Sequence, residues 1–292
     1  MGLFPCDTRR CYRRFAAFRA RKIFAGAAEI AYDDAAYNSV LDENNIMEKF
    51  IYKTKQEMAA AAAATAAQVI NKAIENKGQA NIILATGTSQ LEMLKNLTEA
   101  ETVDWAKVTM FHLDEYIAMG EGHPASFRKF LKERFVDKVP GLMAVHFVNG
   151  DAEDPKQECR RAGSLLAEHP IDAAMVGIGE NGHLAFNDPP ADFETEEEYL
   201  VVELDEKCRN QQLGEGWFET LEQVPRRAIS MSIRQIMKSS CLIVTVPDRR
   251  KAEAVKNALE GQVTPMCPAS ILQRHDNCKI FLDAEAASLL RS

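Results

Sequence analysis

The stretch IDAAMVGIGENGHLAFNDPP (171–190) joins a mostly apolar run to a glycine-rich loop. The run at 171–178 is short and bounded by turn-forming residues, which is typical of a buried parallel strand. The loop contains a G-x-G-x-x-G spacing, but Pro189 and Pro190 would break a helix that followed it. The spacing is therefore not a dinucleotide-binding fingerprint, and the stretch predicts a strand that ends in an irregular loop.

The segments on either side of this stretch alternate between short apolar runs and helical patterns. Further strands are predicted at 81–85, 107–113, 144–148, 228–233, 241–246 and 279–283. Helices are predicted from Met47 to Asn76 with a stop at Gly78, over 89–97, from Pro124, over 250–261 and from Ala284. This alternation predicts an α/β fold: a doubly wound, mainly parallel sheet with helices on both faces, in a Rossmann-like three-layer sandwich.

The chain divides at Met47, where the alternating pattern begins. Residues 1–46 form an irregular N-terminal extension, and seven of the first 25 residues are basic. Four interpretations stay open: a targeting segment, a tail for an anionic partner, a start-site artefact and a disordered tail without a role. We favour the artefact, because the pattern begins directly after a methionine. Residues 47–292 are then expected to form a single domain.

The composition narrows the class of protein. The 292 residues carry a formal net charge of -8, which argues against nucleic acid as a partner because such binding needs a basic surface. No apolar run approaches the roughly 20 residues of a membrane span, and no signal-peptide pattern follows the N-terminal arginines. The seven cysteines include no C-x-x-C pair, which favours a reducing compartment. We expect a cytoplasmic protein with a small-molecule partner and no membrane partner.

The loops that follow strands are candidate sites, because doubly wound sheets bind ligands beyond the carboxyl ends of their strands. After 81–85, Thr86, Gly87, Thr88 and Ser89 form a small, hydroxyl-rich turn that opens a helix. Backbone N–H groups and the positive end of the helix dipole would face an anion there, which suits a phosphate. Ordinary capping of the helix by Ser or Thr explains the same residues equally well.

Two adjacent carboxylates, Asp114 and Glu115, follow the strand predicted at 107–113. Neighbouring residues of a strand point to opposite faces, so one carboxylate should face the cleft and the other a helix or solvent. The carboxylate in the cleft is a candidate general base. A solvated acidic loop is the alternative, and these residues alone favour it.

The glycine-rich loop after 171–178 places His183 near Asn181 and Asp188, whose side chains can orient its ring. A histidine in such a loop at the end of a strand indicates catalysis rather than packing. No second histidine stands at ligand spacing, so a metal site is not expected.

Two longer motifs make the sequence resemble a known family. FHLDEYIAMGEGHPASFRKFL (111–131) is similar to the strand-end DEY and HP-x-S-[FY] segment of the glucosamine-6-phosphate deaminase (isomerase) family. GIGENGHLAFNDPP (177–190) is similar to the G-x-G-x-[DN]-G-H-x-x-F-N-[ED]-P loop of that family. The resemblance covers essentially residues 47–290, and the family shares its fold with 6-phosphogluconolactonases.

The resemblance implies a hexosamine 6-phosphate as the substrate, with no cofactor and no metal. It implies that Asp114 moves the C2 proton of the opened amino sugar to C1, and that His183 opens the pyranose ring with help from Asp188. Asn181 completes this catalytic set and stands where many members have Asp. The implied phosphate-binding residues are Thr86, Gly87, Thr88, Ser89, Lys251 and, in the segment CRNQQLGEGWF, Arg209.

The leading functional prediction is conversion of glucosamine 6-phosphate, or a close hexosamine 6-phosphate, to fructose 6-phosphate or the matching ketose plus ammonia. A 6-phosphogluconolactonase-type hydrolase is the nearest alternative, and it would need no C2 base at Asp114. A non-catalytic sugar-phosphate sensor is a third interpretation. Such regulators carry a DNA-binding segment, however, and residues 1–46 are too short and irregular for one. The stereochemistry of the sugar and a homo-oligomeric state stay open.

Overall fold

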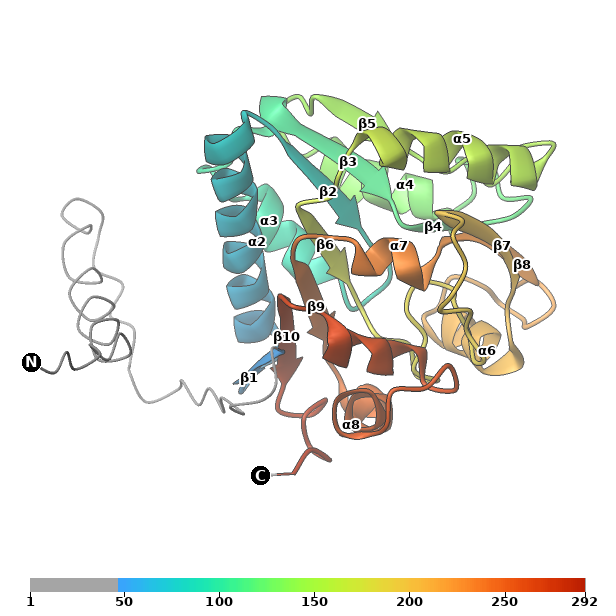
Figure 1. The fold of residues 1–292 in the computed structure, drawn as a ribbon. Helices are drawn as coiled ribbons and strands as arrows, with labels where there is room; N and C mark the ends of the chain where they lie inside the picture. Colours follow the sequence, from blue (N-terminus) through green and yellow to red (C-terminus); the bar gives the residue numbers. More distant parts are fainter. Residues whose placement is uncertain (1–46, 292) are drawn as a thin grey trace, which may run out of the picture. The chain divides into compact units, whose positions relative to one another are not determined.

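The computed structural model describes residues 47–291, so the predicted extension at 1–46 lies outside the described residues. The main sheet has seven strands in the order β1-β10-β9-β6-β2-β3-β5, and each neighbouring pair is parallel (Figure 1). The strands are β1 (Glu48–Tyr52), β2 (Ala80–Leu84), β3 (Val108–His112), β5 (Ala144–His146), β6 (Ala173–Val176), β9 (Leu242–Val246) and β10 (Cys278–Asp283). This arrangement confirms the predicted α/β fold with a doubly wound parallel sheet.

The strand order reverses between β2 and β6. From β2 the chain continues through β3 to β5 on one side, whereas β9 and β10 extend the sheet beyond β6 on the other side. The loops after β2 and β6 therefore diverge and open a crevice at the carboxyl ends of the strands, where such sheets bind ligands. The turn at 86–89 and the loop around His183 follow these two strands, so the topology brings both predicted segments to one place.

The structure also contains a second sheet of three antiparallel strands. A single residue separates its first strand from the end of β3. In it β4 (Asp114–Tyr116) pairs with β8 (Arg227–Met231), and β8 pairs with β7 (Tyr199–Glu203). The prediction that 228–233 joins the parallel sheet is therefore wrong. A short apolar run predicts a buried strand but contains no signal for the sheet that it joins.

The helix predicted from Met47 starts later in the structure, because Met47 leads into β1 at the edge of the main sheet. Helix α2 (Lys55–Lys77) follows Thr54, whose hydroxyl accepts a hydrogen bond from the N–H of Glu57. The carboxylate of Glu57 accepts in turn from the N–H of Thr54, and this capping box fixes the helix start. Gly78 ends the helix in the left-handed conformation, as predicted.

The remaining helices surround the two sheets. They are α3 (Leu91–Thr98), α4 (Phe127–Leu131) with a π-helical continuation (Lys132–Val136), α5 (Pro155–Glu168), α6 (Glu206–Gly214), α7 (Ile233–Met237) and α8 (Ala252–Glu260). Short 3-10 helices cover Trp105–Lys107, Arg249–Lys251 and Pro268–Arg274. Within 47–291, none of the helices combines the length and the apolar character that crossing a membrane requires.

Two predicted helix starts differ from the structure. The helix expected from Pro124 begins at Phe127, because the hydroxyl of Ser126 accepts from the N–H of Lys129 and caps it there. The residues after Ala284 form turns instead of a helix. The carboxylate of Asp283 accepts a hydrogen bond from the N–H of Ala286, which closes the first of these turns.

Helices cover both faces of the main sheet, as the three-layer prediction requires. Along β2, Ile82 and Leu84 pack into one apolar cluster with residues of α2 and α3. Ile83 packs into another cluster with residues of α5 and α8. Because successive strand residues point to opposite faces, both faces of β2 are buried, and the central strand is a rigid support for the loop that follows it.

Candidate active site

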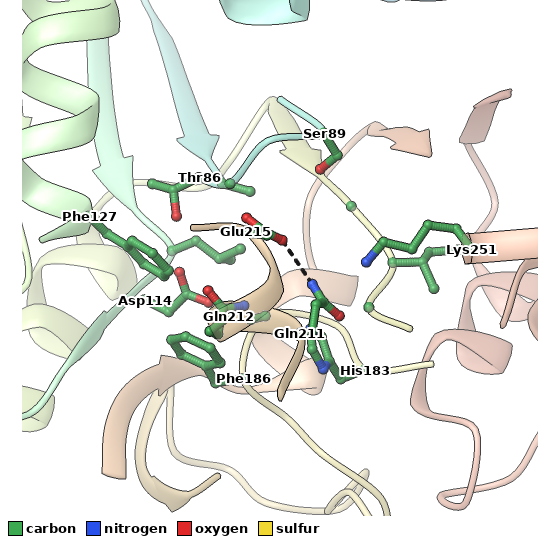
Figure 2. A pocket seen from close by; sticks show the side chains of 17 residues that line it. Thr86, Ser89, Asp114, Phe127, His183, Phe186, Gln211, Gln212, Glu215 and Lys251 are labelled. Carbon is green, nitrogen blue, oxygen red and sulfur yellow. Dashed lines mark hydrogen bonds between the residues drawn. The ribbon is translucent and has the colours of Figure 1, made fainter. Parts of the chain in front are cut away.

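A pocket of about 60 Å³ lies in the crevice at the strand reversal (Figure 2). Six of the predicted site residues line it, namely Thr86, Gly87, Ser89, Asp114, His183 and Lys251, whereas Thr88, Asn181, Asp188 and Arg209 do not.

The hydroxyl groups of the turn after β2 do not cap the helix that follows it. Helix α3 has Gln90 at its N-cap and no side-chain capping bond, so the capping explanation for Thr86 and Ser89 does not hold. Gly87 adopts a φ of 95°, which favours glycine, and its backbone lies at the pocket. The buried Gln90 amide donates to the backbone oxygens of Val176 and Thr245, which ties the turn to the sheet.

Lys251 supplies a buried cation to the same pocket. It is the last residue of the 3-10 helix before α8, and only 4% of its surface is exposed. Burial lowers its pKa to about 8, although the nearby carboxylates of Glu215 and Glu180 favour its charged form. At neutral pH most of the Lys251 side chain is thus cationic, and the pocket combines this charge with N–H and hydroxyl donors.

Asp114 and Glu115 point in opposite directions, as strand geometry predicts, and neither is solvated. Asp114 lines the pocket. Glu115 accepts from the Ser126 hydroxyl (2.8 Å) and from the N–H groups of Phe127 (3.2 Å) and Arg128 (2.9 Å), so it anchors the start of α4. Burial raises the pKa of Asp114 well above its usual value, and the charge of Glu115 raises it further. A carboxylate with a raised pKa is a stronger base than an ordinary one, which suits a general base.

Aromatic rings form the wall beside Asp114. The rings of Tyr116 and Phe127 lie 4.8 Å apart, and those of Phe127 and Phe186 lie 5.6 Å apart. Phe127 and Phe186 line the pocket and flank Asp114 in Figure 2. This apolar wall keeps water from the carboxylate, which is the physical cause of its raised pKa.

His183 is held by a carboxylate behind its ring. Its Nδ1 lies 3.0 Å from Oδ1 of Asp188. Burial opposes the charge of Asp188, but hydrogen bonds from His183 and Asn181 outweigh it, and the pKa of Asp188 is lowered. An ionised carboxylate can only accept, so Nδ1 carries the proton and Nε2 of the neutral ring keeps its lone pair. The predicted orienting role of Asp188 thus has a direct geometric basis.

Asn181 fixes the same loop through both ends of its side-chain amide. Its Oδ1 accepts from the backbone N–H of His183 (3.1 Å), and its Nδ2 donates to Asp188 (2.8 Å) and to Asp205 (3.1 Å). The ring of His183 also packs on Gly179, where a Cβ atom would lie 2.2 Å from Nε2. The side-chain amide of Asn181 therefore donates hydrogen bonds to two carboxylates. Position 179 accepts only glycine, because any Cβ atom there would collide with the His183 ring.

Arg209 does not reach the pocket. Its guanidinium group donates to the backbone oxygens of Leu221 and Val224, on the segment that follows α6. The assignment of Arg209 to the phosphate therefore conflicts with the structure. Its Nε and Nη2 groups are bonded to these carbonyls, and the side chain does not line the pocket.

Helix α6 contributes pocket residues that the sequence did not suggest, namely Gln211, Gln212 and, directly after the helix, Glu215. Gln211 accepts from the N–H of Glu180 (2.8 Å), and Gln212 accepts from the hydroxyl of Tyr116 (2.8 Å). The end of the helix thus forms part of the pocket wall. Polar residues within an isolated helical segment resemble an ordinary solvated face, so the sequence contained no signal for this role.

Comparison with known proteins decides the family. A family model described as "Glucosamine-6-phosphate isomerases/6-phosphogluconolactonase" matches residues 53–281. The chain belongs to this family. The doubly wound parallel sheet and the resemblance noted from the sequence agree with that membership.

Two curated members of the family are named glucosamine-6-phosphate deaminase. One, from Bacillus cytotoxicus, is 37% identical over 222 residues and aligns with 76% of this chain and 82% of its own length. Another, from Bacillus cereus (strain B4264), is 37% identical over 247 residues, which cover 83% of this chain and 89% of the relative.

Solved structures extend the comparison. The structure of a monomeric glucosamine-6-phosphate deaminase has a TM-score of 0.76 and 31% identity, and the match covers 82% of this chain and 99% of that one. A 6-phosphogluconolactonase from Trypanosoma brucei has a TM-score of 0.68 but 18% identity, over 83% of this chain and 98% of that one, so it shows the fold alone.

Proposed function

We propose that this enzyme converts glucosamine 6-phosphate and water into fructose 6-phosphate and ammonia. The observation that supports the proposal is that one pocket is lined by Asp114, His183 and Lys251 together with three residues of the turn after β2, namely Thr86, Gly87 and Ser89. The names of the curated relatives point to the same reaction. The proposal places the enzyme in amino-sugar catabolism in the cytoplasm.

In the proposed complex the phosphate lies on the turn after β2. The Gly87 backbone and the hydroxyls of Thr86 and Ser89 supply hydrogen-bond donors, and Lys251 supplies the positive charge. These groups act on a part of the substrate that does not react, so they bind the ground state and the transition state alike. Their task is to fix the position of the sugar carbons.

Ring opening is assigned to His183. Because Asp188 holds Nδ1–H, the Nε2 lone pair is available to take the proton from the C1 hydroxyl while the bond between C1 and the ring oxygen breaks. The ring oxygen then takes up a proton and becomes the C5 hydroxyl. The product of this step is the open-chain aldehyde.

Asp114 then moves a proton between two carbons. Its carboxylate removes the proton from C2 and returns it to C1, while the aldehyde oxygen takes up one proton of the C2 ammonium group, so that the open-chain amino aldehyde becomes a ketose iminium ion with a C1 hydroxyl. Water adds to the iminium carbon at C2, and ammonia leaves. The buried position of Asp114 beside the aromatic wall suits this role, because a desolvated carboxylate is a stronger base than a solvated one.

Hydrolysis of 6-phosphogluconolactone is the second candidate, since lactonases share the fold. That reaction needs no proton transfer between carbons, so Asp114 separates the two proposals. The test measures ammonia release from the 6-phosphates of glucosamine, galactosamine and mannosamine, and lactone hydrolysis in parallel. Ammonia release that depends on Asp114 and His183 supports deamination. Lactone hydrolysis by an Asp114→Asn variant would instead support the lactonase reaction and overturn the deaminase proposal.

A further inference from the structure

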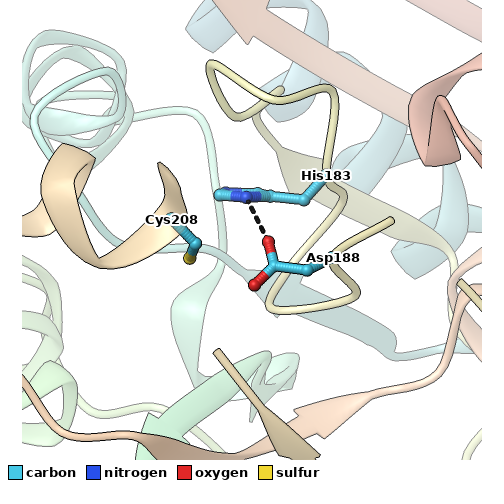
Figure 3. A group of neighbouring side chains, drawn as sticks. All are labelled: His183, Asp188 and Cys208. Carbon is cyan, nitrogen blue, oxygen red and sulfur yellow. Dashed lines mark hydrogen bonds and ion pairs between the residues drawn. The ribbon is translucent and has the colours of Figure 1, made fainter. Parts of the chain in front are cut away.

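Behind the catalytic histidine, three different donor atoms converge. A ring nitrogen of His183, a carboxylate oxygen of Asp188 and Sγ of Cys208 all lie within 4.8 Å of one another (Figure 3), and Nδ1 is the nitrogen that faces Asp188. His183 and Asp188 come from the loop after β6, whereas Cys208 comes from α6. Spacing in the sequence could not predict this cluster, because its third member stands on a separate element.

The donor set suits one class of ion. Imidazole nitrogen, carboxylate oxygen and thiolate sulfur together are typical ligands of Zn²⁺ and of the softer Cd²⁺. Three protein ligands leave a fourth position of a tetrahedral ion for water, so such an ion can exchange with solution, unlike one in a closed structural site.

The surroundings of the cluster match those of a metal site. The Asp188 carboxylate accepts from Asn181 Nδ2 (2.8 Å) and from the N–H of Asp205 (2.9 Å), which hold it in a fixed orientation. Such outer hydrogen bonds are what orient ligating carboxylates. The carboxylate of Asp205 accepts from the N–H of Cys208 (2.6 Å), so a second negative charge lies close to the thiol. The negative charges of these two carboxylates therefore favour the binding of a divalent cation at the cluster.

We propose that Zn²⁺ or Cd²⁺ binds His183, Asp188 and Cys208 and thereby inhibits the enzyme. The ion takes the Nδ1 lone pair of His183, the Nδ1 proton moves to Nε2, and the thiol releases its proton to solvent. One proton is released for each ion bound. Nε2 then donates instead of accepting, so it cannot take the C1 hydroxyl proton, and this link to inhibition rests on the proposed function.

The test uses the full chain and Cd²⁺ as the probe. Titration should produce the ultraviolet charge-transfer band of a cadmium thiolate, in step with loss of ammonia release, and a chelator should reverse both. In the Cys208→Ser variant, the absorbance that the Cys208 thiolate contributes to this band should be absent. The substitution should also raise the inhibitory Cd²⁺ concentration more than tenfold, since losing even an outer partner of a ligand costs about 10–100-fold in affinity.

The matched control is Cys267→Ser, because the Cys267 thiol is more accessible but lies outside the cluster. This variant should keep the band and the inhibition that Cys208→Ser loses. Cadmium NMR of the wild-type protein tests the same site without a substitution, through coupling to a histidine nitrogen.

Two results would overturn the inference: an unchanged band in Cys208→Ser, or Cd²⁺ bound through Cys208 with undiminished ammonia release. Failure of the proposed function is a separate result, because the wild-type protein would then release no ammonia from any of the sugars even without metal. The charge-transfer band would still report on the cluster in that case.

Discussion

The carboxylate of Glu215 accepts a hydrogen bond from the backbone N–H of Thr88, with an N–O distance of 3.3 Å. Its second oxygen accepts from Nε2 of Gln211 (3.1 Å), so α6 and the turn after β2 meet through this side chain. Backbone N–H groups at the start of a helix are natural anion sites. In the described conformation, the protein's own carboxylate therefore lies where the proposed substrate would place its phosphate.

Replacing Glu215 by Gln should lower KM for the sugar phosphate while leaving kcat largely unchanged. The substitution removes a negative charge that competes for the N–H of Thr88 and would repel the phosphate. The expected decrease is roughly threefold to tenfold, because one like charge nearby costs on the order of 1 kcal/mol. Steady-state kinetics and competition by inorganic phosphate measure it. Glu219→Gln, at an exposed position of the same segment, is the control, and an equal change in both variants would contradict the competition.

Asp114→Asn should lower kcat by roughly 10²–10⁴-fold with little effect on KM, since a positioned base acts mainly in the transition state. The pH dependence of the wild-type enzyme should also show that an ionised Asp114 is required. Because Asp114 must be ionised and its pKa is raised, kcat/KM should fall as the pH drops through that raised pKa, at a higher pH than for an ordinary carboxyl group. A variant that keeps more than a tenth of the wild-type kcat would exclude Asp114 as the base.

Lys251→Met should raise KM far more than it lowers kcat, because a fixed cation binds the phosphate in both the ground and the transition state. In the wild-type enzyme the lysine loses its charge as the pH rises through about 8, so KM should increase above that pH. Lys256→Met, on the exposed face of α8, is the matched control. A KM for Lys251→Met that equals the wild-type value would place the phosphate elsewhere.

Asn181→Asp should reduce both stability and activity. In this chain the amide of Asn181 donates to Asp188 and Asp205, so an aspartate would lose the donor and bring three carboxylates together. We expect a lower melting temperature at neutral pH and partial recovery at acidic pH, where one carboxylate takes up a proton. Thermal unfolding at several pH values measures this, and unchanged melting would show that the loop rearranges.

Removal of residues 1–46 should preserve deaminase activity, since every proposed site residue lies within the described part of the chain. The shortened chain would start at Met47, directly before β1, whose five residues pair with β10. Activity and thermal unfolding of the shortened and full-length chains can be compared directly. Loss of either property would identify a structural or regulatory role for the extension.

The fold was predictable where burial dominates the pattern. Strands such as β2 and β9 are buried throughout, so their apolar runs stand out from the flanking turns. β1 was missed because its half-exposed sequence EKFIY adjoins the alanine-rich helix and reads as its first turn. β7 was missed for a similar reason, since partly exposed residues make up most of it. Tertiary pairing, not local preference, decides such edge segments.

The candidate site was predictable only where its residues follow the central strands. Asp114, at the start of β4, and His183, in the loop after β6, follow strands whose carboxyl ends the sheet topology brings together, so their position made them candidates. Glu215 lies 127 residues from its partner Thr88, and nothing local indicates that contact. Arg209 shows the reverse error, because a basic residue in the right segment binds backbone oxygens instead of a ligand.

Asp114 and Glu115 point to opposite faces of β4, and this fixes the number of residues that can lie between β3 and β4. Asp114 is opposite Ser230 and Glu115 is opposite Ile229, and a shift of one residue would exchange the two carboxylates between the pocket and the start of α4. The link between β3 and β4 can thus accept substitutions but not insertions or deletions. In a library of single-codon indels, active clones should be absent from this link and common in the exposed turn around Gly122.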